Sequence, residues 1–299
     1  MNAFPSSTFF SAAPEWGWLI TLYFFFGGLA GGSYFLASLI DLFARPQDRP
    51  LSRLGFYIAF PCIVISGILL TFDLHRPLRF WHMLIESNTY QPMLKLWSPM
   101  SVGSWALVIF GAFSFVSLLG ALADAERIPW PAWREVHPPS ILGRFVAVIG
   151  GIFGFYVAGY TGVLLAVTNR PIWSDTPVLG LLFIVSAAST SAALMILLAD
   201  RWQWSMPGLL DLHRFDAWVI ALEFIILITL MISLGPVLRA WLNAWGLLLL
   251  LGVVGVGMLA PLALYWRGSG QRNMMISAAL VLVGGFLLRV VIVFSAQGV

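Results

Sequence analysis

Two tyrosines at matching depth in two long apolar segments are the first candidates for chemistry. Tyr23 lies eight residues after the start of its segment at Glu15, and Tyr160, in the run Tyr160-Thr161-Gly162, lies eight residues before the end of its segment at Thr168. At 1.5 Å per residue, each phenol lies about 12 Å inside its helix. Because a phenol hydroxyl donates and accepts hydrogen bonds, the pair predicts a polar pocket for a lipid-soluble, hydrogen-bonding ligand.

An acid, an imidazole and a guanidinium follow where the second apolar segment ends on the same side. These residues are Asp73, His75 and Arg76. Ionisable groups at membrane depth are costly and mark ligand or proton paths, and imidazole titrates near neutrality. Asp73 and His75 are therefore candidates for proton exchange beside the tyrosines. The alternative is an interfacial Asp73–Arg76 ion pair that only anchors the helix end.

Three further charges lie inside apolar segments. Glu223 is about 18 Å and Arg289 about 24 Å from the opposite side, at 1.5 Å per residue. If they pair, they form either part of a proton path or a structural ion pair that holds the second half of the chain together. Asp41, near the inner end of the first segment, is interpreted as an acid that snorkels to the surface, and it is a further candidate for proton transfer.

The composition predicts an integral membrane protein. Hydrophobic residues make up 60% of the chain and charged residues 10%, with a mean hydropathy of +0.91, whereas soluble domains carry about 25% charged residues. The net charge of +3 is spread over short loops, which argues against nucleic acid as a partner. The single cysteine, Cys62, lies in an apolar run, so it forms neither a disulfide nor a cluster site of its own.

Eight apolar runs are long enough to cross a hydrocarbon core that needs about 20 residues. The predicted spans are Glu15 to Phe43, Leu51 to Leu74, Pro99 to Ala123, Ser140 to Thr168, Pro177 to Ala199, Asp211 to Ser233, Ala240 to Trp266 and Asn273 to Ala296. The fold class is therefore all-α. We expect an outer segment at 1–14 without the features of a cleaved signal, and two four-helix bundles at 15–168, with the pocket, and 177–299.

The distribution of basic residues predicts the orientation. Ten arginines lie on the side away from the N-terminus, and five basic residues lie on the N-terminal side. Since basic loops stay in the cytoplasm, both termini are expected outside, in the periplasm of a Gram-negative cell. The predicted location is the cytoplasmic (inner) membrane of a bacterium or archaeon.

Small residues indicate where helices approach closely. The first span carries Gly27, Gly28, Gly31 and Gly32, and the fourth carries Gly150, Gly151, Gly154, Gly159 and Gly162. Such G-x-x-x-G spacing lets helices touch along their length. Taken alone it indicates packing, but the matched tyrosines on the same two spans favour a shared site.

Four motifs in order resemble the NrfD/PsrC family, the membrane subunits of polysulfide-reductase-like complexes. They are Gly27-Gly28-Leu29-Ala30-Gly31-Gly32, Asp73-Leu74-His75-Arg76-Pro77, Ser98-Pro99-Met100-Ser101-Val102-Gly103-Ser104-Trp105 and Tyr160-Thr161-Gly162. The resemblance covers the first four spans through these motifs and the last four through helix number and length.

This resemblance implies a haem-free subunit that binds a quinone or quinol, either menaquinone or ubiquinone, and is not catalytic alone. It implies that Tyr160 hydrogen-bonds a quinone carbonyl near the outer face, with Tyr23, His75 and Arg76 around it. Some members carry histidine at the position of Tyr23. Because a phenol does not titrate near neutrality, His75 or Asp73 is the better candidate for proton exchange.

The electrons are expected to come from, or pass to, a partner. His75 and His82 are predicted at the outer surface and His137 and His213 at the inner surface, so no two histidines face each other as haem ligands, and no metal is expected. The expected partner is an iron–sulfur, ferredoxin-like subunit docked on the outer loop from Arg76 to Trp97. The resemblance implies a further, molybdopterin-containing catalytic subunit.

Two other classes of function compete with this interpretation. Eight helices with central charges also fit a secondary transporter or proton-translocating channel. Against it, no helix is broken in both halves, charges at mid-depth are few, and the polar cluster lies at one face. A purely structural membrane anchor is the third possibility, and it predicts that Tyr160→Phe leaves activity intact.

Overall fold

The computed structural model describes residues 15–201, 206–268 and 270–297. Within these ranges the regular elements are helices, and the long connection between α3 (Arg49–Asp73) and α4 (Pro99–Asp124) includes one isolated β-bridge, between Ile85 and Pro92. Eight of the helical stretches are long and apolar enough to cross a membrane. The predicted all-α membrane fold with eight spans is therefore confirmed.

The spans agree with the predicted segments to within a few residues at most ends. They are α2 (Trp18–Phe43), α3 (Arg49–Asp73), α4 (Pro99–Asp124), α5 (Ile141–Ala166), α6 (Leu179–Arg201), α7 (Met206–Leu234), the continuous α8 (Ala244–Leu248), η5 (Leu249–Leu259) and α9 (Ala260–Trp266), and α10 (Gln271–Ser295). The short helices η1 (Pro46–Asp48), η2 (Pro77–Met83), η3 (Pro131–Val136) and η4 (Gly235–Trp241) lie in the connections.

Local sequence explains where several spans begin. The side chains of Ser98 and Ser140 accept hydrogen bonds from backbone N–H groups in the first turns of α4 and α5, which satisfies donors that a helix start leaves free. The described part of α7 runs from Met206, five residues before the predicted start at Asp211. Asn243 caps α8 in the same way. This span was predicted to begin at Ala240, but Ala240 and Trp241 belong to η4.

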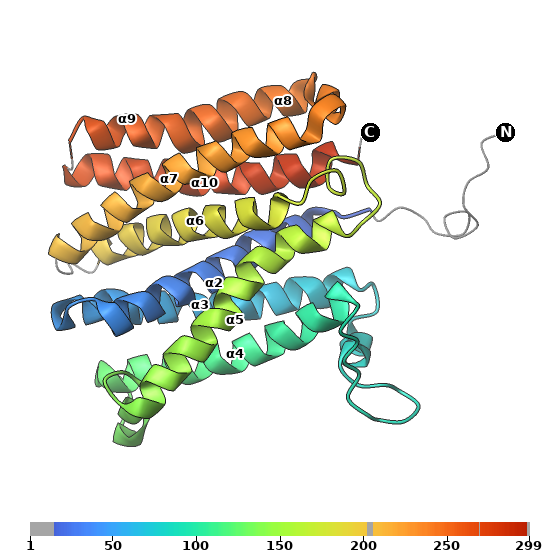
Figure 1. Cartoon of the computed structure of the whole chain (residues 1–299). Helices are drawn as coiled ribbons and strands as arrows, with labels where there is room; N and C mark the ends of the chain where they lie inside the picture. The colour runs from blue at the N-terminus through green and yellow to red at the C-terminus, as the bar shows by residue number, and fades with distance from the viewer. Residues whose placement is uncertain (1–14, 202–205, 269, 298–299) are drawn as a thin grey trace.

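The spans lie side by side, and α2 occupies the centre (Figure 1). It packs against α3 and α5 on one side and against α6 on the other, so the first four and last four spans share one buried core. The start of α2 and the end of α10 lie at the same end of the molecule, where Gln297 Nε2 donates to the Trp16 carbonyl at 2.6 Å. We call this end the N-terminal side. The division into two four-helix bundles, at 15–168 and 177–299, stays a prediction.

Glycines in α2 set how closely its neighbours approach. A Cβ placed on Gly31 would lie 2.2 Å from the carbonyl oxygen of Gly154 in α5, and one on Gly32 would lie 2.6 Å from that of Ala187 in α6. Both contacts are with backbone, which cannot move aside as a side chain can. The predicted close contact between the first and fourth spans is therefore found, and α6 makes an equally close one.

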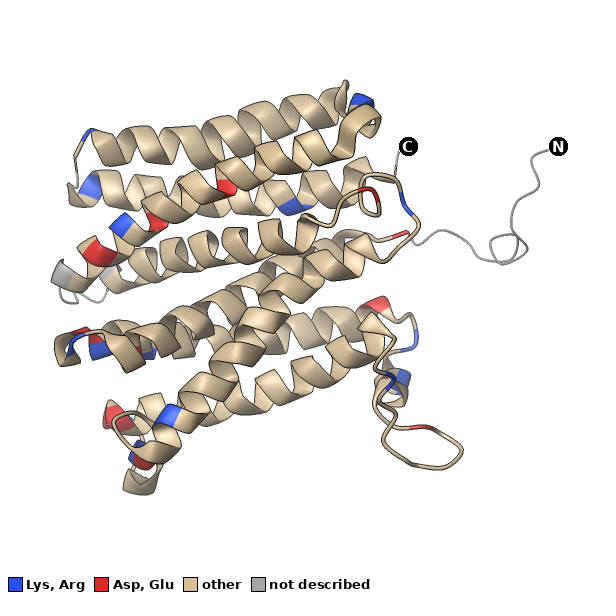
Figure 2. Ribbon diagram, viewed as in Figure 1, with Lys and Arg blue, Asp and Glu red and all other residues tan. Residues whose placement is uncertain are grey.

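Charged residues gather at the two ends of the helices, and few lie between (Figure 2). We call the end opposite the N-terminal side the arginine-rich side, because ten of the arginines belong to its loops and helix ends. On this side Arg53 of α3 pairs with Asp124 of α4 at 2.8 Å, and Arg134 of η3 pairs with Glu126 at 3.0 Å. These pairs fasten the helix ends and loops to one another.

Candidate functional site

A cavity of about 220 Å³ opens near the N-terminal side, between α2, α3, α4, α5 and η2. Most of its wall is apolar and includes Ile20, Leu70, Met100, Leu107 and Leu164. Its polar lining comes from four helices and consists of Tyr23, Thr71, Asp73, Ser104 and Tyr160. An apolar cavity with a few convergent polar groups is the usual form of a small-molecule site.

Tyr23 and Tyr160, the two tyrosines predicted to share a level, line this one cavity from α2 and α5. Both are almost fully buried, with 1% and 6% of their surface exposed. Among the described residues, neither phenol hydroxyl has a hydrogen-bond partner. Since buried hydroxyls are normally hydrogen-bonded, the two free donors indicate a place for a ligand with acceptor oxygens.

The phenol of Tyr160 packs against Gly103 of α4. A Cβ on residue 103 would lie 2.0 Å from Cζ and 2.2 Å from Oη of Tyr160. The Tyr160 ring also stacks on Tyr156, with 5.7 Å between centroids and 20° between planes. Gly103 belongs to the motif that opens α4, but the sequence did not reveal its role, since nothing in the pattern shows which residue of another helix it meets.

Tyr23 lies in an aromatic wall that reaches into the second half of the chain. Its ring contacts Phe24, and Phe24 in turn meets Trp16 edge to face. Trp16 stacks on Trp173 at 5.1 Å, and the Trp173 indole donates to the Ile292 carbonyl of α10 at 2.7 Å. This side of the cavity is therefore anchored to the last helix.

Of Asp73, His75 and Arg76 at the end of α3, only Asp73 reaches the cavity. Asp73 lines the cavity, whereas His75 and Arg76 are exposed and do not. His75 takes a left-handed backbone conformation with φ of 55° and ends the helix, and its Nδ1 lies 2.7 Å from the Asp73 carbonyl oxygen. The described residues include no ion pair between Asp73 and Arg76, so the alternative of an interfacial anchor pair is not realised.

Glu223 and Arg289, predicted inside the last four spans, are both buried there. Arg289 Nη1 donates to the Ser186 hydroxyl at 2.8 Å and to the Gly285 carbonyl at 2.7 Å. The Ser186 hydroxyl also interacts with the Glu223 carboxyl, so the two charges are linked through a serine and make no direct ion pair. The guanidinium also lies over the rings of Phe25 and Phe183.

A second buried acid in this region was missed. Asp216 is 1% exposed and accepts a hydrogen bond from Ser189 Oγ at 2.7 Å. It lies seven residues before Glu223, two turns along one face of α7, and this spacing is visible in the sequence. His213, one turn further toward the arginine-rich side, is buried against Tyr265. The acids therefore form a column that leads from that side to Arg289.

Asp41 does not lie where it was expected. The interpretation as a snorkelling surface acid is wrong, because its side chain is only 2% exposed. His137 Nδ1 lies 2.9 Å from Asp41 Oδ2, and the Ser52 hydroxyl donates to Asp41 Oδ1. The loop before α5 folds back over α2 and encloses the carboxyl, which no span could reveal by itself. Asp41 and His137 lie at the arginine-rich end, away from the tyrosine cavity.

The four histidines lie toward the two ends of the molecule. His75 and His82 lie in the exposed loop on the N-terminal side, and His137 and His213 lie at the other end. Among the described residues, no group of three or more His, Cys, Asp or Glu side chains could hold a metal ion.

Comparison with known proteins finds relatives that match nearly the whole chain. The family model described as "Polysulphide reductase, NrfD" matches residues 7–299. The C polypeptide of polysulfide reductase from Wolinella succinogenes is 30% identical, over 94% of each protein, and protein NrfD of Escherichia coli is 26% identical, over 98% of each. A selenate reductase subunit of Mesobacillus selenatarsenatis shares 28% identity over 96 residues, which are 32% of this chain and 20% of that protein.

Proposed function

The chain belongs to the NrfD polysulphide reductase family, and on that premise we propose that it is the quinone-reactive membrane subunit of a multi-subunit oxidoreductase. It exchanges electrons and protons between a menaquinone or ubiquinone pool and an iron–sulfur partner subunit. The observation that carries the proposal is the cavity in which Tyr23 and Tyr160 present two unpartnered hydroxyls. A quinone carries two carbonyl acceptors on an apolar ring, which is the complement of this lining.

The residues of the cavity have different parts in this proposal. Tyr160, held by Gly103, donates a hydrogen bond to one carbonyl, and Tyr23 donates to the other or forms the wall beside it. Reduction of a quinone to a quinol takes up two electrons and two protons, and the reverse releases them. Asp73 lines the cavity and is partly exposed, so it passes protons between the site and water. His75 and Arg76, which follow the end of α3, act at the outer rim.

The loop between α3 and α4 is the proposed docking surface for the partner. It projects beyond the helices on the N-terminal side (Figure 1). Leu78, Tyr90 and Trp97 are 88%, 75% and 81% exposed on it, and large exposed apolar side chains outside a membrane mark protein interfaces. We propose a ferredoxin-like iron–sulfur subunit here, joined to a molybdopterin catalytic subunit. One relative is named as a subunit of a selenate reductase, which supports such an assembly.

The proposed orientation follows from the basic residues. The arginine-rich side faces the cytoplasm and the docking loop faces outward, in the cytoplasmic membrane of a bacterium or archaeon. Both termini then lie outside. Both ends of the described chain lie on one side of the molecule, as eight spans require.

The buried acids of α7 favour a second function, proton translocation. Asp216 and Glu223 lead from the arginine-rich side to Arg289, and a Cβ on Gly28 would lie 3.1 Å from the Arg289 guanidinium. Gly28 is five residues from Tyr23 along α2, about 8 Å by helix rise. A proton that enters along this column therefore arrives near the quinone site. Asp41, with His137, offers a further proton acceptor at the arginine-rich end.

One experiment tests the main proposal directly. The complex is extracted in mild detergent, its subunits are identified, and its iron–sulfur signal is followed by electron paramagnetic resonance while a quinol or quinone analogue is added. We expect an iron–sulfur subunit to co-purify and its signal to change with the analogue. A complex without such a subunit, or a signal that does not respond, overturns the proposal.

A further inference from the structure

The cavity that Tyr23 and Tyr160 share is closed by two of its helices and open between two others. Its lining from α2 and α5 is buried and consists of Ile20, Tyr23, Tyr160 and Leu164. Its lining from α3 and α4 includes exposed residues: Gly67 on α3, and Met100 and Val108 on α4, with 53% and 50% of their surface exposed. We call this opening, bordered by Gly67, Met100 and Val108, the α3–α4 window.

The side-chain interactions that join α3 directly to α4 all lie on the other half of these helices. Among the described residues they are the Arg53–Asp124 ion pair at 2.8 Å, the hydrogen bond from the Tyr57 hydroxyl to the Ala121 carbonyl at 3.1 Å, and the contact of the Phe60 and Phe115 rings at 5.2 Å.

The part of α3 beyond these interactions is open toward α4. Pro61 follows Phe60 inside α3, and a proline in a helix removes a backbone hydrogen bond and kinks the helix. Six residues further, a Cβ on Gly67 would meet no atom within 4 Å. The two helices are therefore fastened on the arginine-rich side and leave the window between them on the N-terminal side.

The window lies at the depth of the hydrocarbon core. Gly67 is six residues from the end of α3 at Asp73, about 9 Å by helix rise. Val108 is nine residues from the start of α4 at Pro99, about 14 Å by the same measure. Half of a hydrocarbon core is about 15 Å thick. The window therefore opens into one leaflet, the one on the N-terminal side, and an apolar chain can pass between Gly67 and Val108.

We propose that the isoprenoid tail of the quinone leaves the cavity through the α3–α4 window, and that the quinone enters the site from the membrane by this route. The inference rests on the proposed quinone site. The cavity holds about 220 Å³, whereas sites that enclose a drug-sized ligand hold about 300–1,000 Å³. It can thus enclose the ring beside Tyr23 and Tyr160 but not a long tail as well. Gly67 keeps the route open because it has no side chain.

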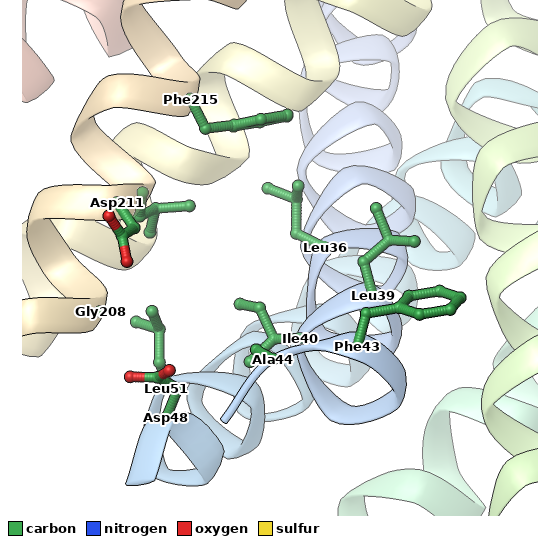
Figure 3. Close-up of a pocket in the computed structure, with 11 residues that line it drawn as sticks. Leu36, Leu39, Ile40, Phe43, Ala44, Asp48, Leu51, Gly208, Asp211 and Phe215 are labelled. Carbon is green, nitrogen blue, oxygen red and sulfur yellow. The ribbon is translucent and has the colours of Figure 1, made fainter. Parts of the chain in front are cut away.

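The larger hollow at the arginine-rich end does not serve this purpose. Its volume is about 300 Å³, and Figure 3 shows it between apolar side chains of α2, such as Leu36, and of α7, such as Phe215. Leu36 is the residue of α2 in this hollow that lies nearest to Tyr23 in the sequence, and it is thirteen residues away, about 20 Å by helix rise. A ring held at the tyrosines cannot place the start of its tail there. This hollow therefore provides a control position.

The test compares quinols with and without a tail on the intact complex in proteoliposomes. The probes are menaquinol with its full tail and menadiol, which lacks the tail, and ubiquinol with its tail-less analogue forms a second pair. The measured quantity is the rate at which each quinol changes the iron–sulfur signal, expressed as the ratio of the tailed to the tail-less rate. We expect Gly67→Phe to lower this ratio about tenfold, because the added ring fills the space of the tail.

Three further variants accompany Gly67→Phe. Val108→Trp narrows the window from its other edge and is expected to lower the ratio as well. Gly111→Phe is the matched control, because a Cβ at Gly111 in α4 also meets no atom within 4 Å and this residue does not line the cavity. Ala44→Phe fills part of the hollow in Figure 3. Both controls are expected to keep the ratio of the unaltered complex.

A photoreactive probe gives a second measurement. Menaquinone with a diazirine on its first isoprene unit is expected to label α3 and α4 within one turn of Gly67 and Val108. Labelling confined to η2 and the loop after it overturns the lateral route. So does an equal loss for both quinols in Gly67→Phe, or an unchanged ratio in both window variants, and the quinone site itself then stands. If neither quinol changes the signal of the unaltered complex, the proposed function fails, and the window fails with it.

Discussion

The phenol of Tyr160 lies directly against the backbone of Gly103, so that a methyl group on residue 103 would be 2.2 Å from its oxygen. The two residues are on α5 and α4 and are separated by 57 positions in the chain. The contact limits where the hydroxyl can lie within the cavity, and the ring also stacks on Tyr156. The absence of a side chain at residue 103 thus makes room for the Tyr160 hydroxyl, the proposed hydrogen-bond donor.

Gly103→Ala is expected to displace the Tyr160 phenol without unfolding the chain. A shift of about 1 Å in a positioning group can reduce a rate by up to 100-fold, so we expect quinone-linked turnover to fall by about 10- to 100-fold. The values of kcat and KM for a quinol analogue are to be measured on the assembled complex. Gly111→Ala is the matched control, because a Cβ at Gly111 in the same helix meets no atom within 4 Å. Equal activity of the two variants would contradict the role of Gly103.

Tyr160→Phe removes the hydroxyl while it keeps the ring. We expect quinone-linked activity to fall by about tenfold, the effect of one lost hydrogen bond of about 1.5 kcal/mol. Tyr156→Phe is the control, since Tyr156 is 38% exposed and does not line the cavity. Activity is followed with a quinone analogue, and gel filtration shows whether the subunits stay together. If Tyr160→Phe is fully active, the chain is a structural anchor or has its quinone site elsewhere.

Glu223→Gln tests the column of acids in α7. If protons pass through Glu223, the membrane potential generated per quinone turned over falls, because glutamine cannot carry a proton. The potential is measured with a dye in proteoliposomes, with Glu126→Gln, a 79% exposed acid of the loop before η3, as the control. Unchanged turnover and unchanged potential would leave Glu223 with only a structural part, in which it stabilises the buried Arg289 through Ser186.

Asp41→Asn is expected to destabilise the chain. It removes the buried carboxylate that His137 and Ser52 contact, and a hydrogen bond to a charged group typically contributes about 1.5–3 kcal/mol. The thermal unfolding temperature should drop clearly. The exposed Arg134–Glu126 pair at 3.0 Å provides the comparison, since its loss through Glu126→Gln should change the unfolding temperature little. A similar drop in both variants would show that burial does not decide the strength of the Asp41–His137 pair.

The sequence determined the membrane class, the eight spans and the depth of the main residues. A backbone in lipid must satisfy its own hydrogen bonds, so an apolar run of sufficient length forms a helix wherever it occurs. Once helices are fixed, rise per residue gives depth, and this placed Tyr23 and Tyr160 at one level. Both tyrosines line one cavity. Asp73 joined them because α3 ends at the same side.

Only the tertiary structure decided which side chains meet. Rotation about a helix axis and the approach of distant helices depend on packing, which spacing along one segment does not record. For this reason three contacts between distant residues were not predicted. These are the packing of Tyr160 against Gly103, the enclosure of Asp41 by His137, and the link from Glu223 to Arg289 through Ser186. The left-handed turn at His75 likewise left His75 and Arg76 outside the cavity that Asp73 lines, because the chain leaves the helix there.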